Sequence, residues 1–194
     1  MVLPETDTRN GRAYVTAGLK MLRGLIAGRP TGWVVDLRGN QGGDMHPMLT
    51  VVASLLGEGE KGRFISPHGE TSWGIRRGHV YNGGTTAFRW HRVPGARNQP
   101  VAVLVDGGTA SSGEAVLISF LGAEDTRTFG APTAGYATAN EVFRLPDGAR
   151  LAITTALMAD RTGRTYGNAP IAPHTLVDTE DALSAAIEWL AGRA

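Results

Sequence analysis

Two short apolar runs, each followed by a glycine-rich loop and then a helical pattern, constrain the fold of this chain more than any other feature. Residues 32–37 (GWVVDL) and 101–105 (VAVLV) are rich in β-forming residues and lack polar alternation, which is typical of strands buried on both faces. The loops that follow are residues 38–44 and 106–114. In α/β sheets, functional groups gather beyond the carboxyl ends of such strands. We therefore expect an α/β fold with a site at these two loops.

The remaining pattern also alternates between helix and strand. Apolar residues at helical spacing predict helices over residues 12–28, 47–56 and 111–121. A last helix, capped by Thr179, is expected to bury one face: Leu183, Ala186, Ile187 and Leu190. A short strand is expected at residues 128–131, and the turn Pro146-Asp147-Gly148 predicts a hairpin between residues 142–145 and 151–157. No repeat or linker divides the chain, so we expect a single domain over residues 1–194.

The stretch 57–98 has the least regular pattern. Three aromatic residues there stand among arginine, histidine and glycine, and we expect them to be exposed: Trp73, Tyr81 and Trp90. Loops with one or two edge strands, around Phe64 and Phe88, are expected for the stretch as a whole. Its aromatic and basic part, residues 73–92, favours a flexible loop on the substrate side or a contact between the subunits of a homo-oligomer.

Composition excludes several classes of function. The net charge is +1, from 19 basic and 18 acidic residues, which does not fit a nucleic-acid-binding protein. The absence of cysteine excludes disulfides, thiol nucleophiles and cysteine-based zinc sites. Nucleotide-binding and zinc-protease motifs are also missing, so neither a cofactor nor a metal is expected. No apolar run is long enough for a transmembrane segment, and residues 1–10 lack an export signal, which leaves the compartment undetermined.

Ser111 stands where the second loop becomes a helix. Backbone N–H groups and the positive end of the helix dipole would stabilise an oxyanion there. However, Ser111 and Glu114 also have the spacing of a capping box, and this spacing by itself favours a plain helix cap over a nucleophile. Gly42 and Gly43 are equally open to two interpretations. They make a tight turn with positive φ, or they let the backbone donate an N–H to a substrate carbonyl.

Taken together, these segments resemble the tail-specific (C-terminal-processing) and tricorn-like serine peptidases. Residues 36–43 (DLRGNQGG) look like the family's D-L-R-x-N-x-G-G segment, residues 103–114 like its nucleophile segment, and residues 130–135 like its G-x-P-T-x-G segment. The hairpin and residues 168–173 follow in the family's order, so the resemblance runs from about residue 32 to residue 173. The nisin-resistance-type members are the nearest subgroup, given Gly42-Gly43-Asp44-Met45 with Pro47-Met48.

The resemblance implies a ClpP/crotonase-like β/α spiral and a serine endopeptidase that cleaves a peptide or protein substrate through an acyl-enzyme. Ser111 would be the nucleophile. The backbone N–H of Ser112 and one from Gly42 or Gly43 would form the oxyanion hole. Glu114, one turn behind Ser111, would order the site electrostatically or cap the helix. Intact relatives are often exported or membrane-associated.

The general base does not follow the family pattern. Tail-specific members place a lysine just after G-x-P-T-x-G, where this chain has Tyr136, and neither Lys20 nor Lys61 lies in a matching segment. Tricorn-like members use a histidine upstream of the segment that corresponds to residues 1–31. None of the five histidines matches that motif: His46, His68, His79, His91 and His174. His46 is nearest a functional loop, whereas His174 is interpreted as surface variation.

We therefore expect no histidine within hydrogen-bond reach of Ser111. We interpret residues 1–194 as the catalytic core of a longer peptidase, without the N-terminal cap region that would hold the histidine. Two alternatives remain open. One is a non-catalytic ligand- or peptide-binding module on the same fold, like the interphotoreceptor retinoid-binding repeats. The other is acyl-CoA chemistry on the related crotonase fold. Asp36 and Arg38 are expected to form a structural ion pair rather than part of a site.

Overall fold

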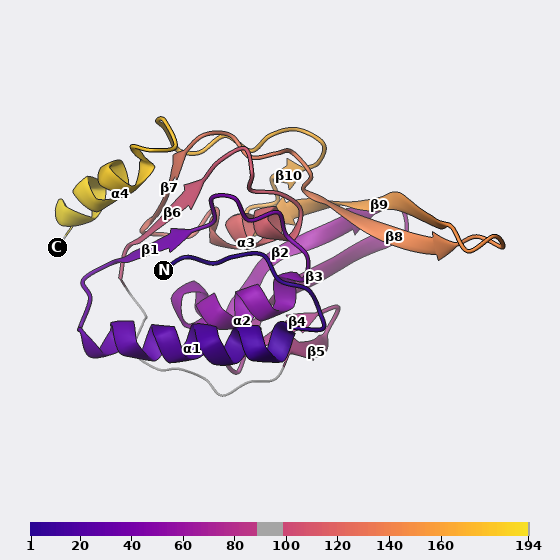
Figure 1. Cartoon of the computed structure of the whole chain (residues 1–194), viewed down its shortest axis with the longest axis horizontal. Coiled ribbons are helices and arrows are strands. Elements are labelled where there is room, and N and C mark those ends of the chain that lie inside the picture. Colours follow the sequence, from indigo (N-terminus) through magenta and orange to yellow (C-terminus); the bar gives the residue numbers. More distant parts are fainter. Residues whose placement is uncertain (89–98, 194) are drawn as a thin grey trace.

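The computed structural model describes residues 1–88 and 99–193, which form two sheets surrounded by helices (Figure 1). The helices are α1 (Gly11–Ala27), α2 (Met45–Leu56), α3 (Ser112–Phe120) and α4 (Ala182–Ala191). In the described part of the chain, no helix is both long and apolar enough to cross a membrane.

The first sheet is parallel and carries the two loops singled out by the sequence. Its strands, in spatial order, are β1 (Trp33–Asp36), β6 (Val101–Val105), β7 (Thr126–Gly130) and β11 (Thr175–Leu176). Every residue of β6 is buried, because its alternate side chains enter two different apolar clusters. Val103 and Val105 face the main core, whereas Ala102 and Leu104 face a smaller cluster beneath α4. Burial on both faces explains the uninterrupted apolar run.

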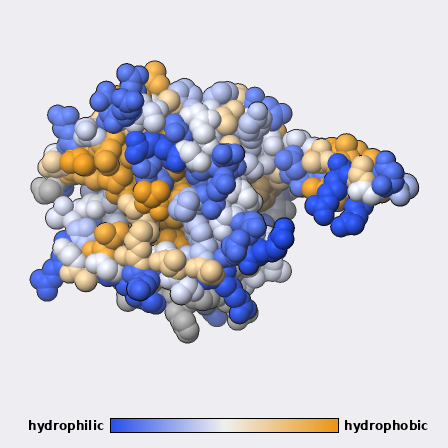
Figure 2. Space-filling view, viewed as in Figure 1, coloured by the Kyte–Doolittle hydropathy of each residue, from blue (hydrophilic) through white to orange (hydrophobic). Residues whose placement is uncertain are grey.

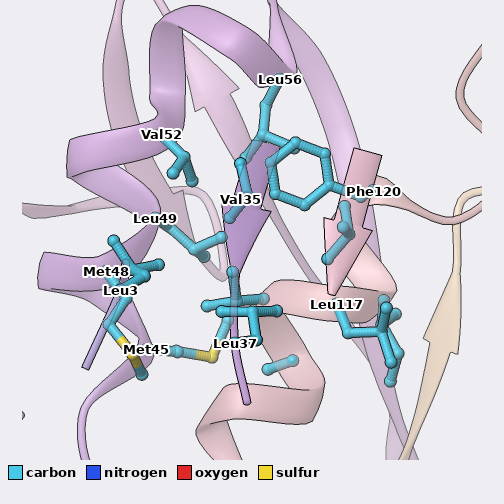
Figure 3. Close-up of a cluster of buried hydrophobic side chains, with 14 of the residues drawn as sticks. Leu3, Val35, Leu37, Met45, Met48, Leu49, Val52, Leu56, Leu117 and Phe120 are labelled. Carbon is cyan, nitrogen blue, oxygen red and sulfur yellow. The ribbon is translucent and has the colours of Figure 1, made fainter. Parts of the chain in front are cut away.

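The main core fills the space between the first sheet and helices α2 and α3 (Figure 3). Val35 and Leu37 extend from β1 and its end, Leu49 comes from α2, and Leu117 and Phe120 come from α3. All five side chains are at most 1% exposed, so helices α2 and α3 are fixed relative to β1 by close packing. This packing positions the loops at the carboxyl ends of β1 and β6.

The second sheet is antiparallel and corrects our prediction for residues 57–98. Its strands are β2 (Gly59–Ser66), β3 (Gly69–Arg76), β4 (His79–Asn82), β5 (Thr85–Phe88), β8 (Thr138–Arg144), β9 (Arg150–Asp160) and β10 (Thr165–Tyr166). The spatial order is β10-β9-β2-β3-β4-β5, with β8 paired to β9. Residues 59–88 are thus strands joined by short turns rather than loops with one or two edge strands, and residues 73–88 are not a flexible loop.

Trp73 and Tyr81 are buried, at 0% and 7% exposure, so the prediction that they are exposed was wrong. Trp73 packs 4.6 Å from the ring of Phe64 and donates its indole N–H to Ser119 Oγ at 2.9 Å. A Cβ on Gly62 would lie 2.4 Å from the Trp73 ring, which means that this glycine makes room for the indole. Glycine beside an aromatic residue marked close packing here, not a turn. Trp90 and the rest of residues 89–98 lie outside the described residues.

The last helix also differs from its prediction. Its N-cap residue is Asp181 rather than Thr179, and Ala182 and Ala186 are its buried residues. Leu183 and Ile187 are 41% and 55% exposed. The helix packs closely over β6 and β7, and small alanine side chains, not the larger aliphatic ones, fit that contact.

The β8–β9 hairpin projects from the body as an arm (Figures 1 and 2). The predicted turn at Pro146-Asp147-Gly148 is present, with Leu145 N–H bonded to Ala149 O and Gly148 N–H bonded to Leu145 O, both at 2.9 Å. Both strands extend beyond the predicted ranges. Every residue from position 140 to position 154 is exposed, so the distal arm has no packing partner among the described residues.

Candidate active site

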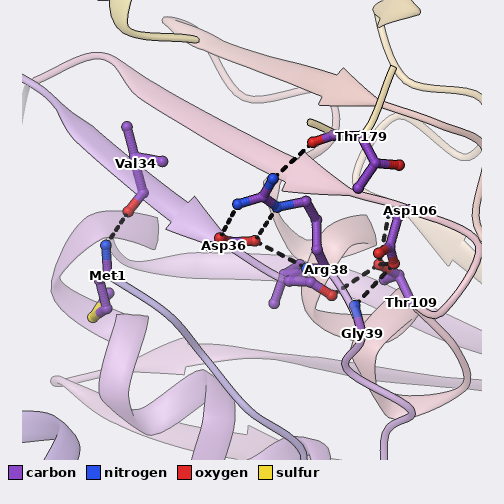
Figure 4. Close-up of polar contacts among 9 residues, drawn as sticks. Met1, Val34, Asp36, Arg38, Gly39, Asp106, Thr109 and Thr179 are labelled. Atoms are coloured by element: carbon purple, nitrogen blue, oxygen red, sulfur yellow. Dashed lines mark hydrogen bonds and ion pairs between the residues drawn. The ribbon is translucent and has the colours of Figure 1, made fainter. Parts of the chain in front are cut away.

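The two loops beyond β1 and β6 are joined directly by hydrogen bonds (Figure 4). Asp106 Oδ1 accepts the backbone N–H of Gly39 at 2.9 Å, and the Thr109 hydroxyl donates to Leu37 O at 2.8 Å. Each bond links the loop after β6 to the loop after β1. The structure therefore brings the glycine segment and the Ser111 segment together, as expected for loops at the same edge of a parallel sheet.

Asp36 and Arg38 form the structural ion pair that the sequence predicted. Arg38 Nη2 lies 2.7 Å from Asp36 Oδ2, and Arg38 Nε donates to Asp36 Oδ1 at 2.9 Å. The hydrogen bond to Asp36 raises the pKa of Arg38. Arg38 also donates to Thr179 O at 2.7 Å, so the pair ties the end of β1 to the segment before α4 (Figure 4).

Ser111 has a backbone conformation that ordinary helix caps do not adopt. Its φ is 52° and its ψ is −117°, whereas an N-cap residue is normally in the β region. Such a conformation costs a non-glycine residue of order 1–3 kcal/mol and is concentrated at functional sites. The capping-box residues are nevertheless in place, and Ser111 N–H donates to Glu114 Oε2 at 2.9 Å. The side chain is half-buried, and its hydroxyl donates to no described residue.

Glu114 is fully buried and collects four hydrogen bonds. Its Oε2 accepts the N–H groups of Ser111 and Tyr136, at 2.9 and 2.8 Å. Its Oε1 accepts the Thr133 hydroxyl at 2.5 Å and the Gly135 N–H at 3.0 Å. One carboxylate thus binds the Ser111 turn to residues 133–136, which belong to the G-x-P-T-x-G segment. Glu114 therefore links two backbone segments as well as capping the helix.

Gly42 lies directly against the Ser111 turn. Its φ is +107°, and a Cβ at this position would lie 2.8 Å from Ser112 N and 3.0 Å from Ser111 Cβ. The close approach therefore requires glycine. The Gly42 N–H is already used, because it donates to the side chain of Asn40 at 2.9 Å.

Gly43 points its own peptide groups toward Ser112. Thr6 pairs with Gly43 in a parallel bridge, through Thr6 N–H to Gly42 O at 3.2 Å and Asp44 N–H to Thr6 O at 2.7 Å. In this pattern the central residue turns its N–H and C=O to the opposite side. Consistently, Ser112 Oγ donates to Gly43 O at 2.8 Å. Within the described residues, no group accepts the N–H of Gly43 or of Ser112.

A cavity of about 570 Å³ opens beside this glycine corner. It is lined by Glu5, Thr6, Asp7, Asn10, Ala13, Tyr14, Gln41, Gly42 and Gly43. Burial raises the pKa of Tyr14, whose hydroxyl donates to Pro4 O at 2.9 Å. Gly42 and Gly43 therefore border open space, whereas neither Ser111 nor Ser112 lines this cavity.

His46 does not hydrogen-bond Ser111. Its Nδ1 lies 2.8 Å from Asp44 Oδ1, and its Nε2 lies 3.4 Å from the side-chain nitrogen of Asn82. Burial by itself would raise the pKa of Asp44, but hydrogen bonds from the side chain and backbone of His46 and from Thr8 bring it below its usual value. Asp44 is also the N-cap of α2, which explains why the helix begins two residues before the predicted position.

The other candidate bases are also elsewhere. His174 is exposed, which agrees with its interpretation as a surface position; its Nδ1 accepts the Thr128 N–H at 3.1 Å, and partial burial of the ring with nearby Arg127 and Arg164 lowers its pKa. Lys61 is buried in β2 and donates to Glu58 O at 2.9 Å. No histidine or lysine of residues 1–88 and 99–193 hydrogen-bonds Ser111, whereas His91 lies outside this range. The same residues contain no cluster of three side chains that could hold a metal.

Three residues that help to build the site had no predicted role. The Asn40 side chain is buried and binds Leu3 O as well as Gly42 N–H. Thr133 links Glu114 to the backbone of Ile171. Thr6 packs against Gly43, since a Cβ on Gly43 would lie 2.1 Å from the carbonyl oxygen of Thr6. Asn40 and Thr133 occupy motif positions, which was the available signal, whereas nothing in the sequence pointed to Thr6.

Comparison with known proteins gives consistent results. Residues 10–177 match Peptidase family S41. The nisin-resistance protein of Lactococcus lactis subsp. lactis is 37% identical over 161 residues, which cover 82% of this chain and 49% of that protein. The chloroplastic carboxyl-terminal-processing peptidase 2 of Arabidopsis thaliana is 30% identical over 152 residues, covering 78% of this chain and 26% of that one. The chain thus spans about half, or less, of these relatives.

Solved structures show the same architecture. A lipoprotein from Streptococcus agalactiae aligns with a TM-score of 0.80 and 29% identity, over 100% of this chain and 66% of that one. The photosystem II D1 C-terminal processing protease aligns with a TM-score of 0.65 and 22% identity, over 97% and 45% of the two chains. The fold is the expected α/β, ClpP/crotonase-like spiral. With its motifs, its fold and most of its length in agreement, this chain belongs to peptidase family S41.

Proposed function

We propose that Ser111 is the nucleophile of a serine peptidase that cleaves peptide bonds in peptide or protein substrates. The Ser111 oxygen attacks the substrate carbonyl and forms a tetrahedral intermediate. The intermediate expels the amine, which takes up a proton, and water then hydrolyses the acyl-enzyme. The backbone N–H groups of Ser112 and Gly43 hold the oxyanion. Family membership and the arrangement of these three residues support the proposal.

The observation that carries the proposal is the strained Ser111 turn opposite Gly42 and Gly43. A plain cap would need neither the unusual φ and ψ of Ser111 nor a neighbouring glycine on which a Cβ would lie 3.0 Å from the Ser111 Cβ. Of the two candidate glycine donors, Gly43 is favoured over Gly42, because Asn40 already accepts the Gly42 N–H. Removing one oxyanion donor typically costs about 10²–10³ in rate.

Glu114 acts as a positioning residue in this proposal. Its two oxygens are filled by four donors, and it reaches Ser111 through the backbone N–H rather than the hydroxyl. It therefore fixes the turn that presents the hydroxyl and does not take the serine proton. Within the described residues, no side chain that could take this proton hydrogen-bonds the Ser111 hydroxyl, so the proposal requires a base from elsewhere.

The lack of a hydrogen-bonded base beside the Ser111 hydroxyl in the described residues favours a second candidate function. A serine hydroxyl without an adjacent acceptor is a weak nucleophile, so a non-catalytic module that binds peptides or other ligands on this fold also fits. In this case the Gly43 and Ser112 N–H groups would bind a carbonyl or carboxylate without any reaction.

A fluorophosphonate probe separates the two functions. We expect the wild-type chain to gain one label, detected by intact mass, and the Ser111→Ala variant to gain none. Ser184→Ala, which removes an exposed hydroxyl on α4, is the matched control and should label at the wild-type rate. If the wild-type chain stays unlabelled, in a form that includes any further part of the natural protein, the peptidase proposal is wrong and the binding module is favoured.

A further inference from the structure

The arm formed by β8 and β9 presents a free edge of backbone. In the described residues β8 pairs with β9 alone, so its other edge has no partner strand. Exposed apolar side chains accompany this edge: Val142 is 57% exposed, Phe143 42% and Leu145 41%. A long, exposed, apolar edge strand is a template for pairing with another chain, and folded proteins normally protect such edges.

The hairpin turn shows which backbone groups face outward. Leu145 N–H is bonded to Ala149 O, so the pair Leu145–Ala149 points its peptide groups across the hairpin. Because antiparallel pairs alternate, Phe143 and Glu141 also point toward β9. Asn140, Val142 and Arg144 therefore direct their N–H and C=O groups along the free edge of β8. Their partners on β9 direct theirs to the opposite edge of the arm.

The side chains along the edge favour an apolar occupant. Phe143 pairs with Leu151 and Glu141 pairs with Ile153, so Phe143, Leu151 and Ile153 lie on one face of the arm. Farther along β9, within the body, Ala156 and Met158 lie on this same face and are buried. The core-facing surface of the sheet thus continues onto the arm and becomes exposed there. Figure 2 shows hydrophobic side chains along the projecting arm.

The strand begins at the candidate active site. Tyr136, two residues before β8, donates its N–H to the same Glu114 oxygen that accepts the N–H of Ser111. A chain that pairs with the free edge near Thr138 is therefore led toward the Ser111 turn. Asn140, the first of the outward-facing residues, follows Tyr136 by only four positions, at most about 14 Å of extended chain.

We propose that the free edge of β8 binds the substrate as an added β-strand and guides it to Ser111. The substrate class is an unfolded or extended polypeptide with apolar side chains at alternate positions, because backbone pairing supplies affinity and the exposed Phe143 and Leu145, on one face of the arm, favour apolar neighbours. This inference rests on the proposed function, which it extends from the reaction to the form in which the substrate is recognised.

Two proline variants in a Ser111→Ala background test the edge without cleavage. Val142→Pro removes an N–H from the free edge of β8 and leaves the β8–β9 ladder intact. Ala152→Pro, at the directly paired position, removes an N–H from the opposite edge and is the matched control. Binding of fluorescein-labelled casein is measured by anisotropy. We expect Val142→Pro to weaken binding about tenfold or more and Ala152→Pro to change it less than about twofold.

Equal affinities for the two variants, whether unchanged or equally weakened, would overturn the proposal. Hydrogen exchange provides a second measurement that does not depend on proline. Bound casein should protect residues 138–145 of the Ser111→Ala protein more than residues 149–155, and protection elsewhere alone would contradict edge binding. If Val142→Pro instead converts a dimer to a monomer in sedimentation, with casein affinity unchanged, the edge binds a second copy and the proposal is wrong.

The outcome is distinguishable from failure of the proposed function. Fluorophosphonate labelling needs no bound peptide, so Val142→Pro with an intact Ser111 should label at the wild-type rate. Labelling of Ser111 together with unaffected casein binding in Val142→Pro would refute edge recognition and leave the peptidase in place. Selective loss of casein binding in a protein that never labels would support edge recognition and refute the catalysis.

Discussion

The parallel and antiparallel sheets hold their residues by different means. Around the parallel sheet, buried polar groups fix the backbone of the loops: Asn40 and Glu114 each bind peptide groups from more than one segment. In the antiparallel sheet, Trp73 and Phe64 pack against each other within the core. Close packing stabilises a fold, but directional hydrogen bonds are needed to aim individual N–H groups. The molecule therefore places its site among the polar contacts.

The largest effect on stability is expected in the antiparallel sheet. Trp73→Ala should lower the free energy of unfolding by about 4 kcal/mol, because the buried indole leaves a cavity and Ser119 loses its partner. Urea denaturation measures the change. Trp189→Ala, at a half-buried position on α4, is the control and should cost clearly less. A Trp73→Ala loss below about 1 kcal/mol would show that packing does not dominate this sheet.

Glu114→Ala tests the polar side of the comparison. It leaves four donors without an acceptor inside the protein and should cost about 3 kcal/mol in urea denaturation. Unlike Trp73→Ala, it should also strongly slow fluorophosphonate labelling, because the Ser111 turn loses its anchor. Glu124→Ala removes an exposed carboxylate and should change neither quantity. Normal labelling of folded Glu114→Ala protein would refute the positioning role.

A smaller effect of opposite sign is expected at Ser111. Ser111→Gly should be about 1 kcal/mol more stable than Ser111→Ala, since only glycine adopts φ 52° and ψ −117° without strain. Both variants lack the hydroxyl, so thermal or urea unfolding compares backbone strain alone. Equal stabilities would mean that the turn stores no strain, and the main argument against a plain cap would be lost.

The smallest expected effect is a pH dependence at the N-cap of α2. The folded-state pKa of Asp44 lies below its usual 3.8, so its carboxylate stabilises the fold above that pH and loses this contribution as the pH falls toward the folded-state pKa. Between about pH 5 and 2.5, Asp44→Asn should therefore lose less stability than the wild type. Urea midpoints at the two pH values measure the difference, and parallel losses would contradict the assignment.

The sequence predicted the parallel sheet better than the antiparallel one for a physical reason. Strands β1 and β6 are buried on both faces, so their apolar runs are visible locally, and the glycine loops follow them directly. The strands of residues 59–88 carry charged side chains such as Arg63 and Glu70, which pair with one another across the surface of the sheet. Their burial depends on partners distant in sequence, which local pattern cannot show.

The site divides in a similar way. Ser111, Ser112, Gly42, Gly43 and Glu114 were identified from the motifs, and the structure brings them together; their catalytic roles stay predictions. The choice between Gly42 and Gly43 could not be made from sequence, because it depends on where the Asn40 side chain points. That residues 1–194 are a catalytic core with a cap elsewhere, and that the chain forms a homo-oligomer, also stay predictions.

The irregularity near the base of the arm has one further consequence. The β8–β9 register shifts between Ala139 and Asn140, where Thr155 is the extra residue on β9. The bulge takes up this extra residue, so Leu151 and Ile153 lie on the same side as Ala156 although an odd number of positions separates them from it. Deleting Thr155 would leave a regular ladder with the same side chains on each face, because Ala156 would then follow Thr154 in normal alternation. A one-codon insertion at this point can thus be absorbed during evolution without changing what the arm displays.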